Sequence, residues 1–250
     1  MRIVTVTSRS YLIGTLVLLK SIGENGNLKC PVTVVSLDQL TNLEKDRIKS
    51  LVSDVDFFNI QELGVFNFKT EIISSRRTIN LNKLLVLTLP YTQTCVMLDS
   101  DMLCLKDASE ILRIKPYAAC MNFGHLANMR GALNGRLPFN SGLLVFRPSL
   151  EEFNRIQQFA DKFYKDFTRI EHIADQHIWN AYIHHSEIPI TMLGMEFNVT
   201  DTLKNSHKNL YAQIEKKTIF YHFTWEKPWN SSHRLTNEQR IWNRFAESLS

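Results

Sequence analysis

The sequence lacks the features that define several classes of protein. None of its apolar runs is long enough to span a membrane. Its 29 basic residues are spread along the chain rather than gathered in the stripe that nucleic-acid binding requires. Residues 1–7 run straight into a β-branched alternation, which leaves no room for a signal peptide. We therefore expect a cytoplasmic protein with no membrane span and no nucleic-acid partner.

Cysteine is also scarce, with four residues in 250 and no CxxC spacing. They lie in apolar, strand-like segments at positions 30, 95, 104 and 120. This pattern predicts free buried thiols in a reducing compartment. Two triplets of the glycosylation type, Asn198-Val199-Thr200 and Asn230-Ser231-Ser232, are common by chance and carry no weight without secretion.

The remaining composition is that of an ordinary globular protein, with 44% hydrophobic residues and a net charge of +4. One substantial core and one domain, residues 1–250, are expected. Apolar patterning predicts strands over residues 2–7, 32–37, 55–60, 95–98, 117–121, 139–146 and 218–223. It predicts helices over residues 11–22, 42–52, 81–89, 150–167 and 174–183. This alternation indicates an α/β fold with a mainly parallel sheet, whose ligand site lies at the carboxyl ends of the strands.

Local signals refine three of these segments. Thr41 with Glu44, and Ser149 with Glu152, have the spacing of capping boxes at helix starts. The phenylalanine-rich stripe of the helix over 150–167 recurs at helical spacing, which is typical of core packing. The polar, irregular stretch over 59–78 suggests a mobile lid.

Two aspartates follow the buried strand over 95–98. Asp99 and Asp101 are two apart, so on an extended segment their carboxylates point to the same side. Such a pair suits Mg²⁺ or Mn²⁺, which bind one or two carboxylates together with substrate phosphates. The pattern alone is weak, because about one D-x-D is expected by chance in a chain of this length. A second pair, in Asp54-Val55-Asp56, precedes its strand and is therefore predicted to be solvated surface at the wrong end of the sheet.

Three further segments carry groups suited to a polar ligand. Phe139-Asn140-Ser141-Gly142 opens a strand with an amide, a hydroxyl and a bare backbone position, a set that suits a sugar. Asp175-Gln176 begins a helix, where helix-start capping is the plainer role. His222 ends the last strand, shortly before Lys227-Pro228-Trp229. A lone strand histidine is more often structural, but the nearby carboxylate pair favours a metal ligand.

This ordered set of segments resembles the retaining glycosyltransferases of family 8, and their glycogenin-like members in particular. The resemblance extends from Val4 to Trp229. It implies a single nucleotide-sugar-binding α/β domain of the GT-A type. It further implies that Asp99, Asp101 and His222 bind Mn²⁺ or Mg²⁺, which holds the diphosphate of a UDP-sugar donor.

The resemblance also implies the remaining donor contacts. Val6, Thr7 and Tyr11 match positions at the uridine, and Lys83 matches a lysine near the donor sugar and the aspartate pair. Around the transferred sugar, the matching positions are Asn140, Asp175 and Gln176. Ser100, Ser141 and Gly142 belong to the same donor-binding segments. Lys227, with the metal and Arg77, would neutralise the departing diphosphate. Asn122 and the stretch 128–136 are the expected selectors of the sugar.

The chain departs from the family pattern in two places. Between the histidine and the lysine, family members have a link that contains a glycine and is one residue longer than in this chain. Here the link is Phe223-Thr224-Trp225-Glu226 and has no glycine. Where self-glucosylating members carry their acceptor tyrosine, this chain reads Asp201-Thr202-Leu203-Lys204-Asn205-Ser206. Self-glucosylation is therefore not expected.

The predicted reaction is transfer of a hexose, glucose being favoured, with retention at the anomeric carbon. Asp175 and Gln176 are the internal nucleophiles if a covalent intermediate forms, and attack from the leaving-group face is the alternative. A sugar-phosphate nucleotidyltransferase would need a glycine-rich basic loop where Thr7-Ser8-Arg9-Ser10-Tyr11 stands, and a dehydrogenase would need G-x-G-x-x-G. A non-catalytic nucleotide-sugar or glycan-binding module is the third reading. The acceptor (glycan, protein or small molecule) and the oligomeric state, a homodimer included, stay open.

Overall fold

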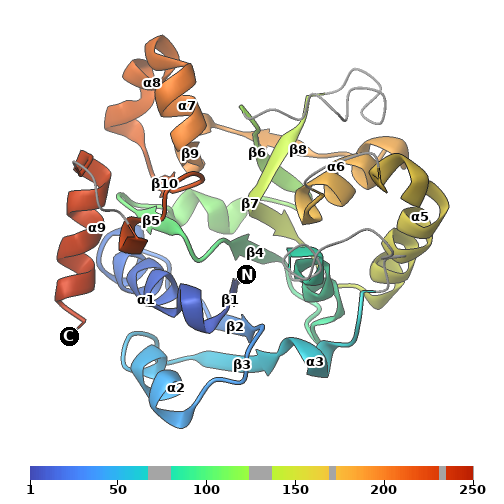
Figure 1. Ribbon diagram of the computed structural model, residues 1–250, viewed down its shortest axis with the longest axis horizontal. Helices are drawn as coiled ribbons and strands as arrows, with labels where there is room; N and C mark the ends of the chain where they lie inside the picture. Colours follow the sequence, from blue (N-terminus) through green and yellow to red (C-terminus); the bar gives the residue numbers. More distant parts are fainter. Residues whose placement is uncertain (67–79, 124–136, 169–172, 231–234, 250) are drawn as a thin grey trace.

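The computed structural model describes residues 1–66, 80–123, 137–168, 173–230 and 235–249 (Figure 1). The larger sheet is formed by β1 (Arg2–Thr7), β2 (Val32–Ser36), β3 (Val55–Asn59), β4 (Cys95–Leu98), β6 (Ala118–Met121), β7 (Phe139–Phe146) and β8 (Thr191–Leu193). A smaller sheet is formed by β5 (Met102–Cys104), β9 (Val199–Thr200) and β10 (Phe220–His222). The α-helices are α1 (Leu12–Ser21), α2 (Asn42–Lys49), α3 (Ile60–Leu63), α5 (Leu150–Thr168), α6 (Asp175–His185), α7 (Asp201–Ser206), α8 (Lys208–Ile214) and α9 (Asn237–Glu247).

The strands of the larger sheet are ordered β3-β2-β1-β4-β7-β6-β8. All of these strands run in one direction except β7, which is antiparallel to both β4 and β6. The predicted α/β fold with a mainly parallel sheet is thereby confirmed. Because β7 is reversed, its first residues lie at the same edge of the sheet as the last residues of β1 and β4.

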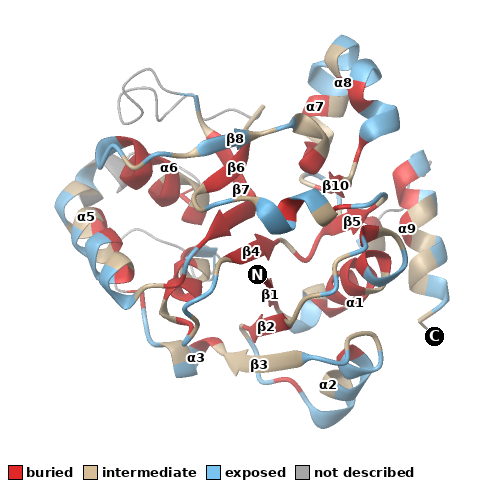
Figure 2. Ribbon diagram, turned by 180° about the vertical axis from the view of Figure 1, so that it is seen from behind, coloured by how far each residue is buried: buried red, intermediate tan, exposed pale blue. Residues whose placement is uncertain are grey.

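Both faces of the larger sheet are covered by helices. In β1, Ile3 packs on the side of α1 and α2, whereas Val4 and Val6 pack on the side of α5 and α6. Neighbours in β4 divide in the same way, as expected from the two-residue period of a strand. The central strands are coloured as buried in Figure 2, and the two sets of side chains along them pack into clusters on opposite faces, which explains their almost continuous apolar sequences.

The smaller sheet has its own apolar cluster. Tyr221 and Phe223 pack there with Val17 of α1, Tyr211 of α8 and Trp242 of α9. Strand β10 lies between β5, to which it is antiparallel, and β9, to which it is parallel. This cluster joins α1 to the C-terminal part of the chain, so α9 lies beside α1 in Figure 1.

Several local expectations are confirmed and others need correction. Thr41 and Glu44 form the predicted capping box at the start of α2. The segment expected as a helix over 81–89 is a 3-10 helix, Asn82–Thr88. The first part of the stretch 59–78 forms α3, with Asn59 as its cap, and residues 67–79 lie outside the described residues. In α5, the apolar stripe begins as predicted, with Phe153, Ile156 and Ala160 in the core.

Only half of the capping box predicted at Ser149 forms. The Ser149 hydroxyl accepts a hydrogen bond from the Glu152 N–H at 3.2 Å. The Ser149 N–H, however, donates to the Leu87 carbonyl, and the Glu152 carboxylate accepts from the Tyr182 hydroxyl. Tertiary partners thus replace the local one.

The four cysteines are free thiols, three buried and Cys30 half-buried. No helix in the described part of the chain is long and apolar enough to cross a membrane. Asp56, expected to be solvated, has a side chain that is 46% exposed, and it also accepts from Arg2 at 2.6 Å and from the Tyr91 hydroxyl at 2.7 Å. Its partner in the second D-x-D, Asp54, is exposed.

A buried acidic residue anchors the last helix. Glu238, at the start of α9, accepts hydrogen bonds from Lys204 of α7 and from the Tyr211 hydroxyl of α8. Burial opposes ionisation, but these donors outweigh it and lower the pKa of Glu238 below its ordinary 4.5. Its contribution to stability is therefore present above about pH 4.5 and is lost as the pH falls through the lowered pKa.

Glu238→Gln is accordingly expected to lower the free energy of unfolding by about 1.5–3 kcal/mol at pH 7, the usual worth of a buried hydrogen bond to a charged group. Urea unfolding at several pH values measures this loss, which should shrink in acid. Glu110→Gln, on an exposed residue, is the matched control and should change stability by less than about 0.5 kcal/mol. Equal stability of the two variants at pH 7 would contradict the anchoring role.

Candidate metal centre and donor cavity

The Asp99-Ser100-Asp101 segment joins the two sheets. Strand β4 ends at Leu98 and β5 begins at Met102, and between them the chain makes a turn closed by a hydrogen bond from the Met102 N–H to the Asp99 carbonyl at 3.1 Å. The segment is therefore a turn and not the extended strand end that the sequence suggested. The Asp99 N–H donates to the Gly142 carbonyl at 2.8 Å, which fixes the turn against β7.

His222 reaches this turn through the smaller sheet. In the register of β10 on β5, His222 lies opposite Met102, and the following Phe223 N–H donates to the Asp101 carbonyl at 3.0 Å. The imidazole lies over Gly142, where a Cβ atom would be 2.3 Å from His222 Cε1. Gly142 was expected to admit a sugar, but here its missing side chain makes room for the histidine.

Asp99, Asp101 and His222 form the cluster of possible metal ligands found in the described part of the chain. His222 Nε2 lies 3.2 Å from Asp101 Oδ1 and 3.9 Å from Asp99 Oδ2. One ligand atom from each residue lies within 4.8 Å of the others. Adjacent ligands of an octahedral Mg²⁺ at about 2.1 Å are about 3 Å apart and opposite ones about 4.2 Å, so the spacing fits a divalent ion after small shifts.

The polar atoms of the cluster support the same fit. Asp101 Oδ1 is buried and has no hydrogen-bond partner in the structure, although it faces His222 Nε2. An orphaned carboxylate oxygen inside a protein is costly, and a cation would satisfy it. His222 Nδ1 is occupied by the Asn198 side-chain oxygen at 3.1 Å, which leaves Nε2 for the centre of the cluster.

Two lysines donate hydrogen bonds to the carboxylate oxygens that do not face His222. Lys83 donates to Asp99 Oδ1 at 2.7 Å, and Lys227 donates to Asp101 Oδ2 at 2.6 Å. Burial lowers the pKa of Lys83, but the neighbouring Asp99 and Asp175 outweigh it and raise the pKa overall. Burial likewise opposes the charge of Asp101, but His222 and Lys227 hold the pKa of this carboxyl well below its usual range. Asp101 therefore stays ionised at neutral pH.

Asp175 is the third carboxylate of this region. It lies at the first position of α6, and its Oδ2 accepts from the Ser141 hydroxyl at 2.8 Å. Burial and the charge of Asp99 raise the pKa of Asp175, while Lys83 and the Ser141 hydrogen bond oppose the rise. The Gln176 side-chain oxygen accepts from the Ser141 N–H at 3.1 Å. With every carboxyl ionised, the three carboxylates and two lysines leave one negative charge in excess, which a divalent cation would reverse.

A cavity of about 250 Å³ opens beside the cluster. It brings together eight of the predicted site residues, Val6, Thr7, Tyr11, Lys83, Asp99, Ser100, Asp101 and Asp175. Ser8, Leu37 and Asn80 also line it and were not predicted. The last residues of β1 and the turn after β4 supply much of the wall, so the cavity lies at the edge of the sheet where the ligand site was expected.

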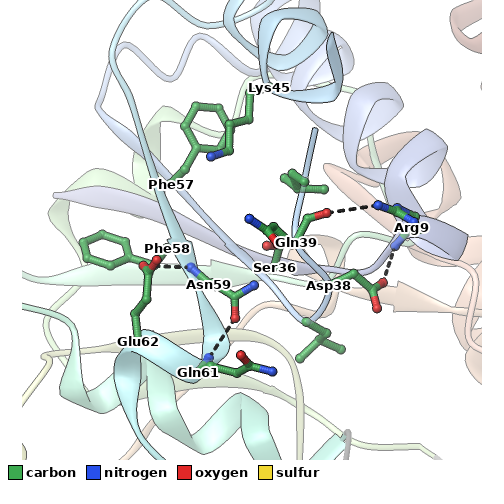
Figure 3. Close-up of a pocket in the computed structure, with 12 residues that line it drawn as sticks. Arg9, Ser36, Asp38, Gln39, Lys45, Phe57, Phe58, Asn59, Gln61 and Glu62 are labelled. Atoms are coloured by element: carbon green, nitrogen blue, oxygen red, sulfur yellow. Dashed lines mark hydrogen bonds between the residues drawn. The ribbon is translucent and has the colours of Figure 1, made fainter. Parts of the chain in front are cut away.

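A larger cavity of about 690 Å³ lies at the carboxyl ends of β2 and β3 (Figure 3). Leu37 lines both cavities. In the larger one, Arg9 donates from its backbone N–H to Asp38 and from its guanidinium to the Gln39 carbonyl. Asn59 caps α3 at its floor. Although it is larger, this cavity has none of the metal-ligand cluster, which borders the smaller one.

The remaining predicted residues divide into three groups. Asn140, Ser141, Gly142 and Gln176 are tied to the cluster by hydrogen bonds or packing. Asn122 lies directly after β6, which is two strands from β4 in the sheet, and its N–H donates to the Pro138 carbonyl. Arg77 and the stretch 128–136 lie outside the described residues.

The link between His222 and Lys227 is short but still delivers the lysine to Asp101. Trp225, in the middle of this link, is exposed and donates from its backbone N–H to Asp201 and from its indole to Thr202. These bonds fasten the link to the start of α7. The Lys227 side chain therefore donates to Asp101, and the Lys227 backbone carbonyl accepts from the Asn230 N–H.

Two residues of the centre were missed by the sequence reading. Asn198 is 2% exposed and holds His222, although its triplet had been set aside as a chance glycosylation motif. Gly14, inside α1, lets that helix approach the Asp99-Ser100-Asp101 turn, because a Cβ atom there would lie 2.5 Å from the Ser100 carbonyl oxygen. A glycine within a helical pattern was the available signal for this close approach.

This fold and this site define a class of protein. A mainly parallel sheet with a D-x-D turn, a histidine from a second sheet and a cavity at the strand ends fits the α/β fold of the GT-A type. The structure matches the galactosyltransferase LgtC with a TM-score of 0.77 at 14% identity, covering 100% of this chain and 96% of that one. It matches the glycosyltransferase GlyE of Streptococcus pneumoniae TIGR4 with a TM-score of 0.67 at 16% identity, covering 98% of this chain and 60% of that one.

The sequence comparisons give the family. Residues 2–233 match the model of glycosyl transferase family 8, and the chain belongs to this family. Glycogenin-1 of Mus musculus is 24% identical over 230 residues, which is 91% of this chain. The chain spans 64% of the length of that relative.

Proposed function

We propose that this family 8 glycosyltransferase transfers a hexose, with glucose favoured, from a UDP-sugar to an acceptor with retention at the anomeric carbon. We further propose that Mn²⁺ or Mg²⁺, held by Asp99, Asp101 and His222, is required. The observation that carries the proposal is the inward orientation of Asp99 Oδ2, Asp101 Oδ1 and His222 Nε2 beside a cavity at the strand ends.

The smaller cavity suits the uridine and diphosphate end of the donor. At about 250 Å³, as lined by the described residues, it is below the usual ligand-pocket range of about 300–1,000 Å³. The donor would therefore extend beyond it, and the larger cavity adjoins it at Leu37. Val6, Thr7 and Tyr11 are the proposed contacts of the uridine.

The chain's own residues divide the work of catalysis. A cation in the cluster would supply charge neutralisation to the leaving diphosphate. Lys227, which donates to Asp101 in the structure, would donate to a diphosphate oxygen of the bound donor. Lys83 would keep Asp99 oriented through its hydrogen bond. Asn140 lies at the same edge of the sheet, near the proposed position of the sugar. Both candidate nucleophiles accept a hydrogen bond from Ser141, but only Asp175 lines the cavity, so its position favours Asp175 if a covalent intermediate forms.

UDP release tests this proposal. The protein is incubated with UDP-glucose, UDP-galactose, UDP-N-acetylglucosamine and UDP-xylose, with Mn²⁺ or with a chelator, and UDP is measured. Metal-dependent release from one donor is expected, together with a rise in melting temperature when that donor is bound. Binding without release, with and without acceptor mixtures, would favour a non-catalytic module. Pyrophosphate formation from UTP and a sugar phosphate would instead favour a nucleotidyltransferase.

A further inference from the structure

Asn198 occupies a buried position between the metal-ligand cluster and β7. It precedes β9 and is 2% exposed. Its side-chain oxygen lies 3.1 Å from His222 Nδ1, and its side-chain nitrogen donates to Asn140 Oδ1 at 2.9 Å. Both ends of the amide are therefore used, and neither faces solvent.

One donor of fixed identity sets the direction of each hydrogen bond in the series that links Gly142, Asn140, Asn198 and His222. The backbone N–H of Gly142 donates to the Asn140 side chain at 2.9 Å, so the atom that receives it must be the amide oxygen. The Asn198 group that meets this same oxygen must then be its NH₂ end. As a result, Asn198 turns its oxygen, which only accepts, toward His222.

An acceptor at Nδ1 determines the form of the imidazole. Nδ1 must carry a proton to donate to Asn198. When a cation takes the place of any proton on Nε2, the lone pair of His222 therefore lies on Nε2. Nε2 is the atom that faces Asp101 Oδ1 and Asp99 Oδ2. Metal-bound histidines generally donate their other ring N–H to a partner of this kind, and loss of that partner typically costs 10–100-fold in metal affinity.

We infer that Asn198 is a positioning residue of the metal centre, which holds His222 in the Nδ1–H tautomer and thereby directs the Nε2 lone pair at the two carboxylates. This inference rests on the metal site of the proposed function. It does not depend on the identity of the sugar, the acceptor or the transfer reaction. Asn198 itself touches neither the cavity nor a carboxylate in the contacts given by the structure, and it acts through His222.

The test separates the tautomer from the binding of metal. Nitrogen-15 NMR of the histidine side chains at a pH of about 8.5, above the ordinary range of imidazole, reports which ring nitrogen of His222 carries the proton. Mn²⁺ binding to the full chain without nucleotide sugar is measured by calorimetry. The wild type is expected to show the Nδ1–H form, and Asn198→Leu should show a mixture of tautomers and about 10–100-fold weaker Mn²⁺ binding.

Two further variants distinguish positioning from simple loss of stability. Asn198→Asp keeps an acceptor for the His222 N–H but replaces the NH₂ that donates to Asn140 with a second oxygen. It should therefore restore the Nδ1–H tautomer, with only part of the affinity. Thr200→Val is the matched control, because this buried residue pairs with His222 in the β9–β10 register and its hydroxyl only caps α7. It should lower the melting temperature and leave Mn²⁺ affinity within about twofold of the wild type.

Three results would overturn the inference. One is an Nε2–H tautomer in the metal-free wild type. Another is wild-type Mn²⁺ affinity in Asn198→Leu, and the third is a mixture of tautomers in Asn198→Asp. If the wild type bound Mn²⁺ as expected but released no UDP from any donor, the proposed transfer would fail while the role of Asn198 still held.

Discussion

Asp101→Asn is expected to abolish Mn²⁺-dependent release of UDP while leaving the protein folded. Asp101 provides one oxygen to Lys227 and the other, which is buried and unpartnered, to the centre of the cluster. An amide removes the negative charge and offers at most one oxygen for both partners. Because loss of a residue that merely supports a ligand costs about 10–100-fold in affinity, loss of the ligand itself should cost at least about 100-fold in transfer.

The sequence contains a matched control for this experiment. Asp54→Asn makes the same change in the second D-x-D, on an exposed residue at the opposite edge of the sheet. Activity and Mn²⁺ titration of both variants should be compared at saturating donor, with melting curves to verify folding. A folded Asp101→Asn protein with activity within about twofold of the wild type would remove Asp101 from the metal centre.

Gly142→Ala is expected to displace His222 and weaken Mn²⁺ binding at least tenfold. The added methyl carbon would lie 2.3 Å from His222 Cε1, 2.7 Å from His222 Nδ1 and 2.9 Å from Asn140 Oδ1. Neither side chain can retreat freely, because His222 is buried and both belong to the hydrogen-bonded set around Asn198. Overpacking of this kind typically costs about 1–3 kcal/mol in stability.

Gly23→Ala provides the comparison for Gly142→Ala. A Cβ atom at Gly23 would meet no heavy atom within 4 Å. It should therefore keep wild-type Mn²⁺ affinity and match or slightly exceed wild-type stability, because alanine restricts the unfolded chain. Calorimetry and urea unfolding measure both quantities. If Gly142→Ala bound Mn²⁺ as tightly as Gly23→Ala, the close packing of His222 on Gly142 would have no role in metal binding.

The sequence was sufficient to predict six of the seven strands of the larger sheet and the members of the candidate metal cluster, but it missed the three-residue strand β8. Long apolar strands such as β4 and β7 carry a clear signal, and the order of Asp99, Asp101 and His222 in the chain led to the family. The smaller sheet was missed because β9 and β5 have two and three residues, too few to show a period. For α9, the spacing of Thr236 and Gln239 was an available signal, since these residues form a capping box.

The sequence predicts the residues of the metal centre better than it predicts the contacts that hold them. Asp99 and Asp101 were paired by the geometry of an extended strand, yet a turn brings them together. Gly142 was assigned to the sugar, yet it accommodates His222. Such contacts depend on segments far apart in the chain, so no local pattern contains them. A single domain over residues 1–250, a cytoplasmic location and the roles proposed for the site residues stay predictions.

The position of the metal cluster between the two sheets has a mechanical consequence. Asp99 follows the last residue of β4 in the larger sheet, while His222 is the last residue of β10 in the smaller one. An ion bound to both would act as a cross-link between parts of the chain that are distant in sequence, much as a disulfide closes a long loop. Metal would then hold the smaller sheet, and the C-terminal helices packed on it, against the rest of the molecule.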